Sequence, residues 1–191
     1  KFPFFKVSYF RKIIKVNSVF FDHFHNNVGY KSTLTENKIL YVDTPIDHPD
    51  RIHREGTVSE NAIYDYYERL NIFLKQISKT FEMDIVICLH PKNKNKLEYF
   101  NDFEISKIKT IDMIPKSEII IFSLSSAVLN SVMYKKKIIN ITSSHLGDYL
   151  LNINNKYVKA LNLFTFNIDN DFSITKDDCI NKMNNSLNTY E

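Results

Sequence analysis

Glycine is scarce in this chain, with 3 among 191 residues. This scarcity excludes the glycine-rich phosphate loops of the GxGxxG and GxxxxGK[ST] types, so a phosphate site here has to be built from other residues. Cysteine is almost as rare, because Cys88 and Cys179 are too few for a disulfide-stapled secreted scaffold. No apolar run approaches the roughly 20 residues of a membrane-spanning helix. We therefore expect a cytoplasmic protein.

The charge is nearly balanced, because 25 basic residues accompany 22 acidic ones and leave a net charge of +3. So small an excess does not predict a nucleic-acid partner, although it would tolerate an anionic ligand. Hydrophobic residues make up 43% of the chain, which is ordinary for a globular domain with a buried core. Since the chain begins at Lys1 rather than at a methionine, we expect it to be the downstream part of a longer protein.

Short apolar runs alternate with helical patterns along most of the chain. The clearest helix begins at a capping box, Thr57 with Glu60, and continues to Phe81 with an apolar residue every three or four positions. A long polar loop to about Gly56 precedes it. Buried strands are expected at residues 39–42, 85–89, 118–122, 137–141 and 164–168, and further helices at 110–117, 127–135, 149–161 and 174–190.

This alternation predicts an α/β fold, a Rossmann-like parallel sheet with helices on both faces. We divide the chain into three parts. Residues 1–37 are expected to be a linker or the tail of a preceding domain, residues 38–170 the Rossmann-like domain, and residues 171–191 a C-terminal helix.

Ligands of an open parallel sheet bind at the carboxyl ends of its strands, which makes the residues after each apolar run informative. Ser125 and Ser126 follow the third run and begin a predicted helix, where hydroxyls, free backbone N–H groups and the helix dipole can hold a phosphate. The alternative is that one of them only caps the helix. His90, followed by Pro91, can donate to a phosphate or sugar oxygen or be an ordinary loop histidine.

The polar segments between these points give weaker signals. The loop that contains Asp43 and His48 holds carboxylates and imidazoles, but its histidine spacing fits no zinc pattern, so we expect no metal. Lys92, Lys94 and Lys96 indicate a solvated turn, with attraction to an anionic ligand or a membrane face as the alternative.

The order of these motifs resembles the nucleotide-binding half of GT-B glycosyltransferases. The resemblance covers residues 38–145 and is strongest to bacterial enzymes that use CMP-activated sugars, of the sialyltransferase and Kdo-transferase type, which carry an HP motif and a downstream serine pair. The motifs that carry it are, in chain order, Ile85-Val86-Ile87-Cys88-Leu89-His90-Pro91, Thr110, Ser117, the strand 119–122 with Ser123 and Ser125-Ser126 after it, and Lys136-Lys137-Ile138-Ile139.

The resemblance implies a role for each motif. His90, Ser125 and Ser126 would engage the phosphate of the CMP donor, with His90 as a phosphate ligand or general acid. Pro91 and Ser123 would belong to the same nucleotide site, and Thr110 would lie near the base. The loop with Asp43 and His48 would face the sugar. In this family the acceptor site and general base lie in an N-terminal domain that the chain does not contain, and Glu55-Gly56 does not complete the family's acidic motif.

The function implied is transfer of a sialic acid-like or Kdo-like sugar from a CMP-sugar to a bacterial surface glycan or glycolipid, such as a capsule or lipooligosaccharide. Transfer would proceed with inversion, without a metal or cofactor, and with contact at the inner face of the cytoplasmic membrane. Two alternatives remain from the sequence. One is another enzyme on the same half-fold, a CDP-glycerol phosphotransferase or a UDP-sugar epimerase, and the other is a non-catalytic nucleotide-binding module.

Overall fold

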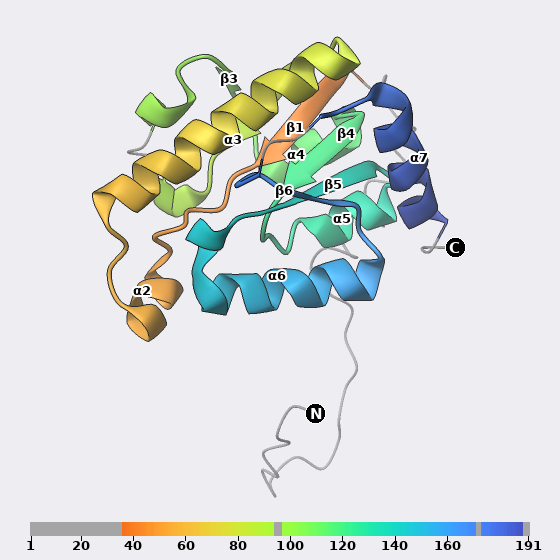
Figure 1. Ribbon diagram of the computed structural model, residues 1–191. Coiled ribbons are helices and arrows are strands. Elements are labelled where there is room, and N and C mark those ends of the chain that lie inside the picture. Colours follow the sequence, from red (N-terminus) through yellow and green to blue (C-terminus); the bar gives the residue numbers. More distant parts are fainter. Residues whose placement is uncertain (1–35, 94–96, 171–172, 189–191) are drawn as a thin grey trace, which may run out of the picture.

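A computed structural model describes residues 36–93, 97–170 and 173–188. They form a six-stranded parallel sheet with the strand order β3-β2-β1-β4-β5-β6, flanked by helices (Figure 1). The strands are β1 (Lys38–Val42), β2 (Asp84–Cys88), β3 (Glu104–Ile105), β4 (Ile119–Phe122), β5 (Lys137–Thr142) and β6 (Thr165–Asn167). This confirms the predicted Rossmann-like α/β class.

The strand order reverses between β1 and β4. From β1 the chain proceeds outward through β2 to β3, then returns to place β4 on the other side of β1 and continues outward through β5 to β6. Neighbouring loops therefore leave the carboxyl ends of β1 and β4 in opposite directions. Such a topological switch point opens a crevice at this edge of the sheet, which is where doubly wound folds bind their ligands.

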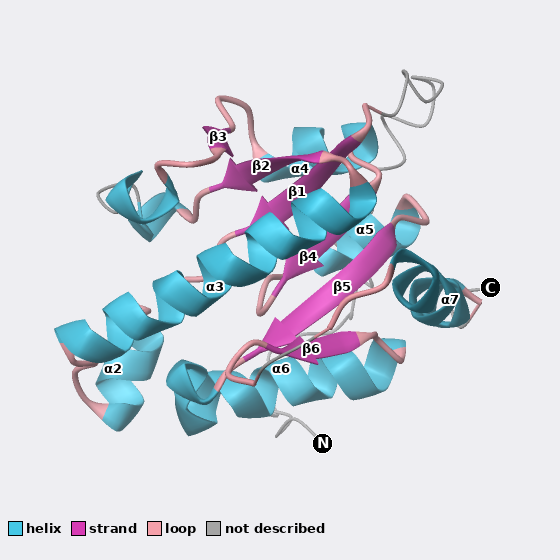
Figure 2. Cartoon of the chain, turned by 45° about the horizontal axis from the view of Figure 1, so that its top comes forward, coloured by secondary structure: helices cyan, strands magenta, loops and turns pink. Residues whose placement is uncertain are grey.

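The helices cover both faces of the sheet. They are α2 (Pro49–Glu55), α3 (Glu60–Phe81), α4 (Thr110–Met113), α5 (Val128–Met133), α6 (Gly147–Leu161) and α7 (Lys176–Leu187), with short 3-10 turns at Pro91–Asn93, Leu97–Phe100, Ile114–Lys116 and Ser144–Leu146. Figure 2 shows α3 lying across one face while α4 and α5 lie behind the other.

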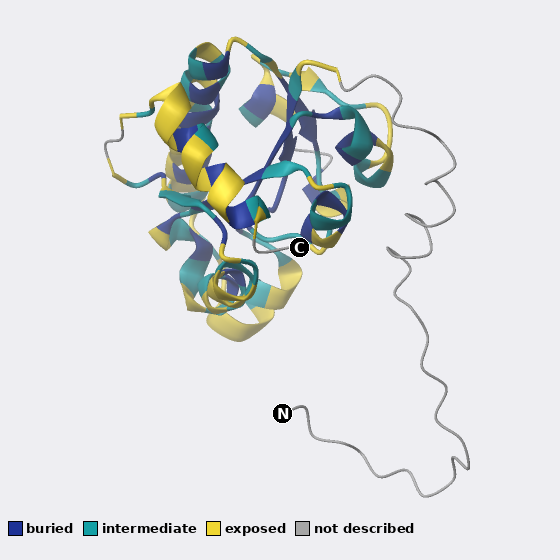
Figure 3. Ribbon diagram, turned by 90° about the vertical axis from the view of Figure 1, so that its right-hand side faces the viewer, coloured by how far each residue is buried: buried dark blue, intermediate teal, exposed yellow. Residues whose placement is uncertain are grey.

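The two faces of the sheet build two apolar cores, because successive side chains of a strand point to opposite sides. Ile39, Ile87 and Ile121 pack with α3 and α7 in the first core, whereas Leu40 and Phe122 pack with α4 and α5 in the second. Buried residues accordingly gather on the strands and on the inner sides of the helices (Figure 3). Both sheet faces exclude water, which explains why the strands appear in the sequence as continuous apolar runs.

The helix α3 is the longest element and shows why the periodic pattern predicted it. Its 22 residues bury one stripe that includes Leu70, Leu74 and Ile77. Its N-cap is Ser59, whose hydroxyl accepts from the N–H of Ala62, so the predicted capping box at Thr57 was wrong by two positions. A serine and a threonine both satisfy the first free N–H groups of a helix, and the pattern alone could not choose between them.

Other boundaries also differ from the prediction. The segment predicted as a polar loop contains α2, which starts at Pro49, a residue favoured in a first helical turn. The helix α5 is shorter than the predicted 127–135. The edge strand β3 was not predicted, because a strand of two residues is too short to show a hydrophobic alternation.

The predicted C-terminal helix appears as α7, which packs Cys179 and Met183 into the first core. The predicted linker at 1–37 lies almost entirely outside the described residues, as do Lys94 and Lys96 of the lysine-rich turn. Within the part of the chain that the structure describes, no helix has the length and apolarity needed to cross a membrane.

Candidate functional site

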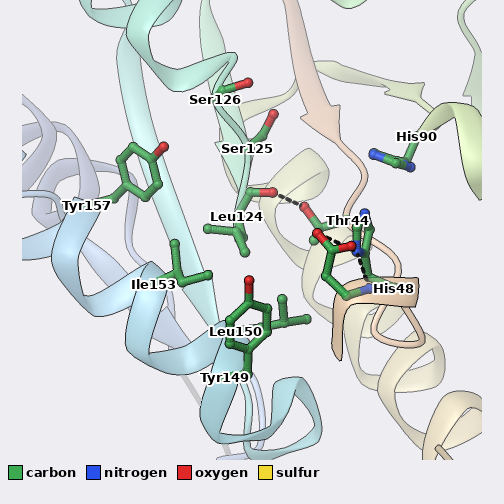
Figure 4. A pocket seen from close by; sticks show the side chains of 11 residues that line it. Thr44, His48, His90, Leu124, Ser125, Ser126, Tyr149, Leu150, Ile153 and Tyr157 are labelled. Atoms are coloured by element: carbon green, nitrogen blue, oxygen red, sulfur yellow. Dashed lines mark hydrogen bonds and ion pairs between the residues drawn. The ribbon is translucent and has the colours of Figure 1, made fainter. Parts of the chain in front are cut away.

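An open pocket of about 290 Å³ lies at the switch point of the sheet. It is formed by the loops that follow β1, β2 and β4 and by one side of α6 (Figure 4). His48, His90, Ser125 and Ser126, four of the residues singled out in the sequence, meet here. The other lining residues are Thr44, Asp50, Leu124, Tyr149, Leu150, Ile153 and Tyr157.

The two histidines of the pocket face each other. Their rings meet edge to face with centroids 5.4 Å apart. The Nδ1 atom of His48 accepts from the backbone N–H of Asp50 at 3.2 Å, and the Nδ1 atom of His90 accepts from that of Lys92 at 3.2 Å. In a neutral imidazole that accepts at Nδ1, the proton resides on Nε2. Each ring therefore keeps an Nε2–H group for donation to a ligand.

His90 is held in its neutral form in the free protein. Burial lowers the pKa of its imidazole, and the neighbouring His48 and Lys92 lower it further. Protonation of Nδ1 would also place two donors against each other, because the N–H of Lys92 already points at that atom. His90 is therefore suited to donate a hydrogen bond to an anionic oxygen without first taking up a proton.

Asp43 lies beneath the pocket rather than in its lining. Its side chain is buried, and its Oδ2 atom accepts from the backbone N–H of His90 at 3.1 Å and from Nδ2 of Asn93 at 2.7 Å. The same amide group of Asn93 donates to the hydroxyl of Tyr67 on α3 at 2.8 Å. A carboxylate after β1 thus fixes the loop after β2, which sets the position of His90.

The serine pair after β4 contributes its side-chain hydroxyl groups to the pocket rather than the N-terminus of a long helix. Ser125 Oγ accepts from the N–H of Ala127 at 3.2 Å, which leaves its O–H free to donate, and Ser126 is exposed. The N-cap of α5 is Ala127, so neither serine is the N-cap residue itself, and the alternative that one of them caps this helix is met only by the bond of Ser125 to the N–H of Ala127. Because α5 has only six residues, its dipole contributes little here. Ser123 is fully buried under the turn.

Two contacts fix the end of β4 relative to its neighbours. The hydroxyl of Thr44 donates to the carbonyl of Leu124, which joins the exits of β1 and β4 (Figure 4). On the other side, Nδ2 of the buried Asn140 donates to the carbonyl of Ser123 at 3.0 Å and to Oδ1 of Asn154 on α6 at 2.8 Å. The serine turn is therefore tied to β1, β5 and α6, which limits its movement.

A charged clamp, formed by Arg51 and Glu55 on α2, connects the loop after β1 with the start of α6. Arg51 donates to the carbonyls of Ile46 and His145 at 2.7 and 2.6 Å, and its Nε atom pairs with Glu55 at 3.1 Å. Glu55 in turn accepts from the backbone N–H of Tyr149, as an acidic cap of α6. The clamp thus holds two walls of the pocket together.

Asp169, after β6, stabilises the turn that leads into α6. Its carboxylate accepts from the hydroxyl of Ser143 at 2.5 Å and from the N–H of Ser144 at 2.6 Å. Burial alone would raise the pKa of Asp169, but these hydrogen bonds, together with the charge of His145, lower it below its usual value. The carboxylate therefore stays ionised under all but strongly acidic conditions.

A second, more apolar pocket of about 470 Å³ lies on the other side of the His90-Pro91 segment. Pro91 and Thr110 line it together with Cys88, so the predicted nucleotide residues are divided between two adjoining pockets. Burial raises the pKa of the Cys88 thiol, which makes it an apolar wall rather than a nucleophile. The full lining is Cys88, Leu89, Pro91, Leu97, Ile105, Ser106, Ile108, Lys109 and Thr110.

The side of α6 that faces the first pocket was not predicted as part of a site. Tyr149, Ile153 and Tyr157 recur every four residues and so share one side of the helix. The same spacing is typical of a helix that packs on a core, so the sequence alone could not show that these residues line a pocket. Among the described residues no group of three or more metal-binding side chains is close enough to hold a metal ion.

Comparisons with known proteins identify a remote structural similarity. The sequence matches no model of a known protein family and no curated protein. Among solved structures, the chain is similar to a family 9 glycosyl transferase from Veillonella parvula DSM 2008, with a TM-score of 0.36 and 11% sequence identity. The similarity covers 91% of this chain but 53% of that protein, so the chain spans about half of its length.

Proposed function

We propose that this chain is the donor-binding part of a glycosyltransferase that uses a nucleotide-activated sugar. The observation that carries the proposal is the pocket at the switch point, where His48, His90, Ser125 and Ser126 gather around one open space. All four can donate hydrogen bonds, and the one acidic residue of the lining, Asp50, has its carboxylate 3.7 Å from Nδ1 of His48. Such a set fits a phosphate group, although the chain lacks a glycine-rich loop.

The position of the pocket supports the same assignment. Doubly wound sheets bind nucleotides in the crevice at the switch point, and this crevice is bounded by the loops after β1, β2 and β4. The order of His90-Pro91, Thr110 and Ser125-Ser126 resembles that of CMP-sugar enzymes. We therefore propose a CMP-sugar as the donor, with its phosphate near His90 and its base near Thr110 in the second pocket.

The proposed reaction is a direct displacement at the anomeric carbon. An acceptor oxygen forms a bond to this carbon while the bond to the donor phosphate breaks, and the electron pair leaves with the phosphate oxygen. The Nε2–H of His90 and the two serine hydroxyls stabilise the charge on that phosphate. Because the pKa of His90 is lowered, its role is that of a hydrogen-bond donor rather than a general acid. A base from the acceptor half takes the proton of the acceptor hydroxyl.

Replacing Ser125 and Ser126 together by alanine tests this assignment. If the hydroxyls bind phosphate, titration calorimetry with CMP should show an affinity lowered by about ten-fold or more, because bonds to a charged group contribute about 1.5 to 3 kcal/mol each. The stability of the fold should fall by no more than about 1 kcal/mol.

Ser59→Ala is the matched control, because Ser59 caps α3 and lies outside the pocket. This variant should lose about 1 kcal/mol of stability and bind CMP as the wild type does. If the double variant behaves like Ser59→Ala, the serine pair is structural and the proposed phosphate site is refuted.

A further inference from the structure

The first pocket has two unlike sides. His48, His90, Ser125 and Ser126 form a polar side that presents hydrogen-bond donors. Opposite them lies the α6 wall, formed by Tyr149, Leu150, Ile153 and Tyr157. Figure 4 shows the phenol groups of Tyr149 and Tyr157 directed toward the interior of the pocket, with Ile153 between them and Leu150 beside Tyr149. A ligand that fills the pocket therefore meets hydrogen-bond donors at one end and a mixed apolar and phenolic surface at the other.

The phenol groups of the α6 wall are free to bind. Both tyrosines are half-buried, and neither hydroxyl has a hydrogen-bond partner among the described residues. The guanidinium of Arg54 lies 4.6 Å from the centre of the Tyr149 ring, which holds this ring in place by a cation–π contact. The wall thus offers two oriented hydroxyls beside apolar surface.

The size of the pocket limits what the α6 wall can contact. At about 290 Å³ the pocket lies just below the range for small-molecule sites, which is about 300 to 1,000 Å³. A phosphate with one ring fits this space, whereas a whole nucleotide-sugar needs the second pocket beyond His90-Pro91 as well. The nucleobase and the transferred sugar must then occupy different pockets.

We infer that the α6 wall binds the sugar that is transferred, and that Tyr149 and Tyr157 select it. This inference rests on the proposed function. A sugar ring combines apolar C–H faces, which pack against Tyr and Ile side chains, with hydroxyls that pair with phenol groups. A flat nucleobase suits the second pocket better, since its lining by Cys88, Pro91 and Ile108 is mostly apolar.

The test compares free nucleotides with their sugar derivatives on the full chain. The affinities of CMP, CDP, UDP and GDP and of a sugar derivative of each are measured by calorimetry for the wild type and for Tyr149→Phe/Tyr157→Phe. The inference predicts that the double variant binds the sugar nucleotide about 5- to 30-fold more weakly and the free nucleotide unchanged, because only the two hydroxyl contacts are lost. Tyr64→Phe, at an exposed tyrosine of α3, is the control and should change neither affinity.

A second measurement does not depend on any variant. Saturation-transfer NMR of the wild type with the sugar nucleotide should show transfer from tyrosine ring protons to the sugar protons more strongly than to the base protons. If the wild type binds no nucleotide at all, the proposed function and this inference both fail. If nucleotides bind but the double variant weakens both ligands equally or neither, the inference alone is refuted.

Discussion

Gly147 gives the sharpest test of how the pocket is held together. Its φ of +71° lies in a region that residues with a side chain rarely adopt, and a Cβ atom placed there would lie 2.2 Å from Oε2 of Glu55 and 2.6 Å from Nε of Arg51. Gly147→Ala should therefore carry two costs. The backbone strain contributes about 1 to 3 kcal/mol. Displacement of the Arg51–Glu55 clamp adds about 2 kcal/mol, because hydrogen bonds of a charged group are lost.

Gly56→Ala separates these two costs. Gly56 has a φ of +86°, so alanine there carries comparable strain, but among the described residues no atom beyond its two chain neighbours lies within 4 Å of the Cβ position. Urea unfolding followed by circular dichroism should show Gly147→Ala to be less stable than Gly56→Ala by about 2 kcal/mol. Equal losses in the two variants would refute the idea that the clamp is tightly packed against the start of α6.

Two predictions concern pH. The pKa of Asp169 is lowered in the folded protein, so its contribution to stability is present above its unfolded pKa, near 3.9, and is lost as the pH falls through the folded value. The variant Asp169→Asn should be less stable than the wild type by about 1 kcal/mol at pH 7. Urea unfolding of this variant should also show a weaker loss of stability in acid. The pKa of His90 is also lowered, so folding favours its neutral form, and the stability of the fold increases as the pH rises from the folded pKa to about 6.5. The variant His90→Gln should show a smaller increase in stability between pH 5.5 and 7.5. An increase as large as that of the wild type would contradict the conclusion that His90 is neutral in the folded protein.

The fold could be predicted because its strands are buried on both sides. Runs such as 85–89 and 137–141 are apolar throughout, and α3 shows a helical period over six turns, so element types and parallel topology follow from the pattern. Boundaries that depend on a single local contact could not be predicted. The helix α2 depends on Pro49 and on the clamp to α6, a segment about 95 positions further along the chain.

The residues of the candidate site that come directly after strands could be predicted, whereas those on one side of a helix could not. His90, Ser125 and Ser126 were found because each comes after an apolar run, and the carboxyl ends of parallel strands meet at one edge. Tyr149 and Tyr157 were missed, since a spacing of four residues is equally typical of core packing. Asp43 was expected to face the sugar, but a buried position beneath the loop cannot be distinguished from an exposed one in sequence.

Thermal unfolding of the chain with CMP, CDP, UDP and GDP in parallel tests most directly whether the pocket binds a CMP donor. A ligand that binds only the folded state at 100 times its dissociation constant stabilises that state by about 2.7 kcal/mol. We expect CMP to raise the melting temperature more than the other three, and Ser125→Ala/Ser126→Ala to abolish most of this rise. No rise with any nucleotide, or an equal rise with all four that survives in the double variant, would contradict this expectation.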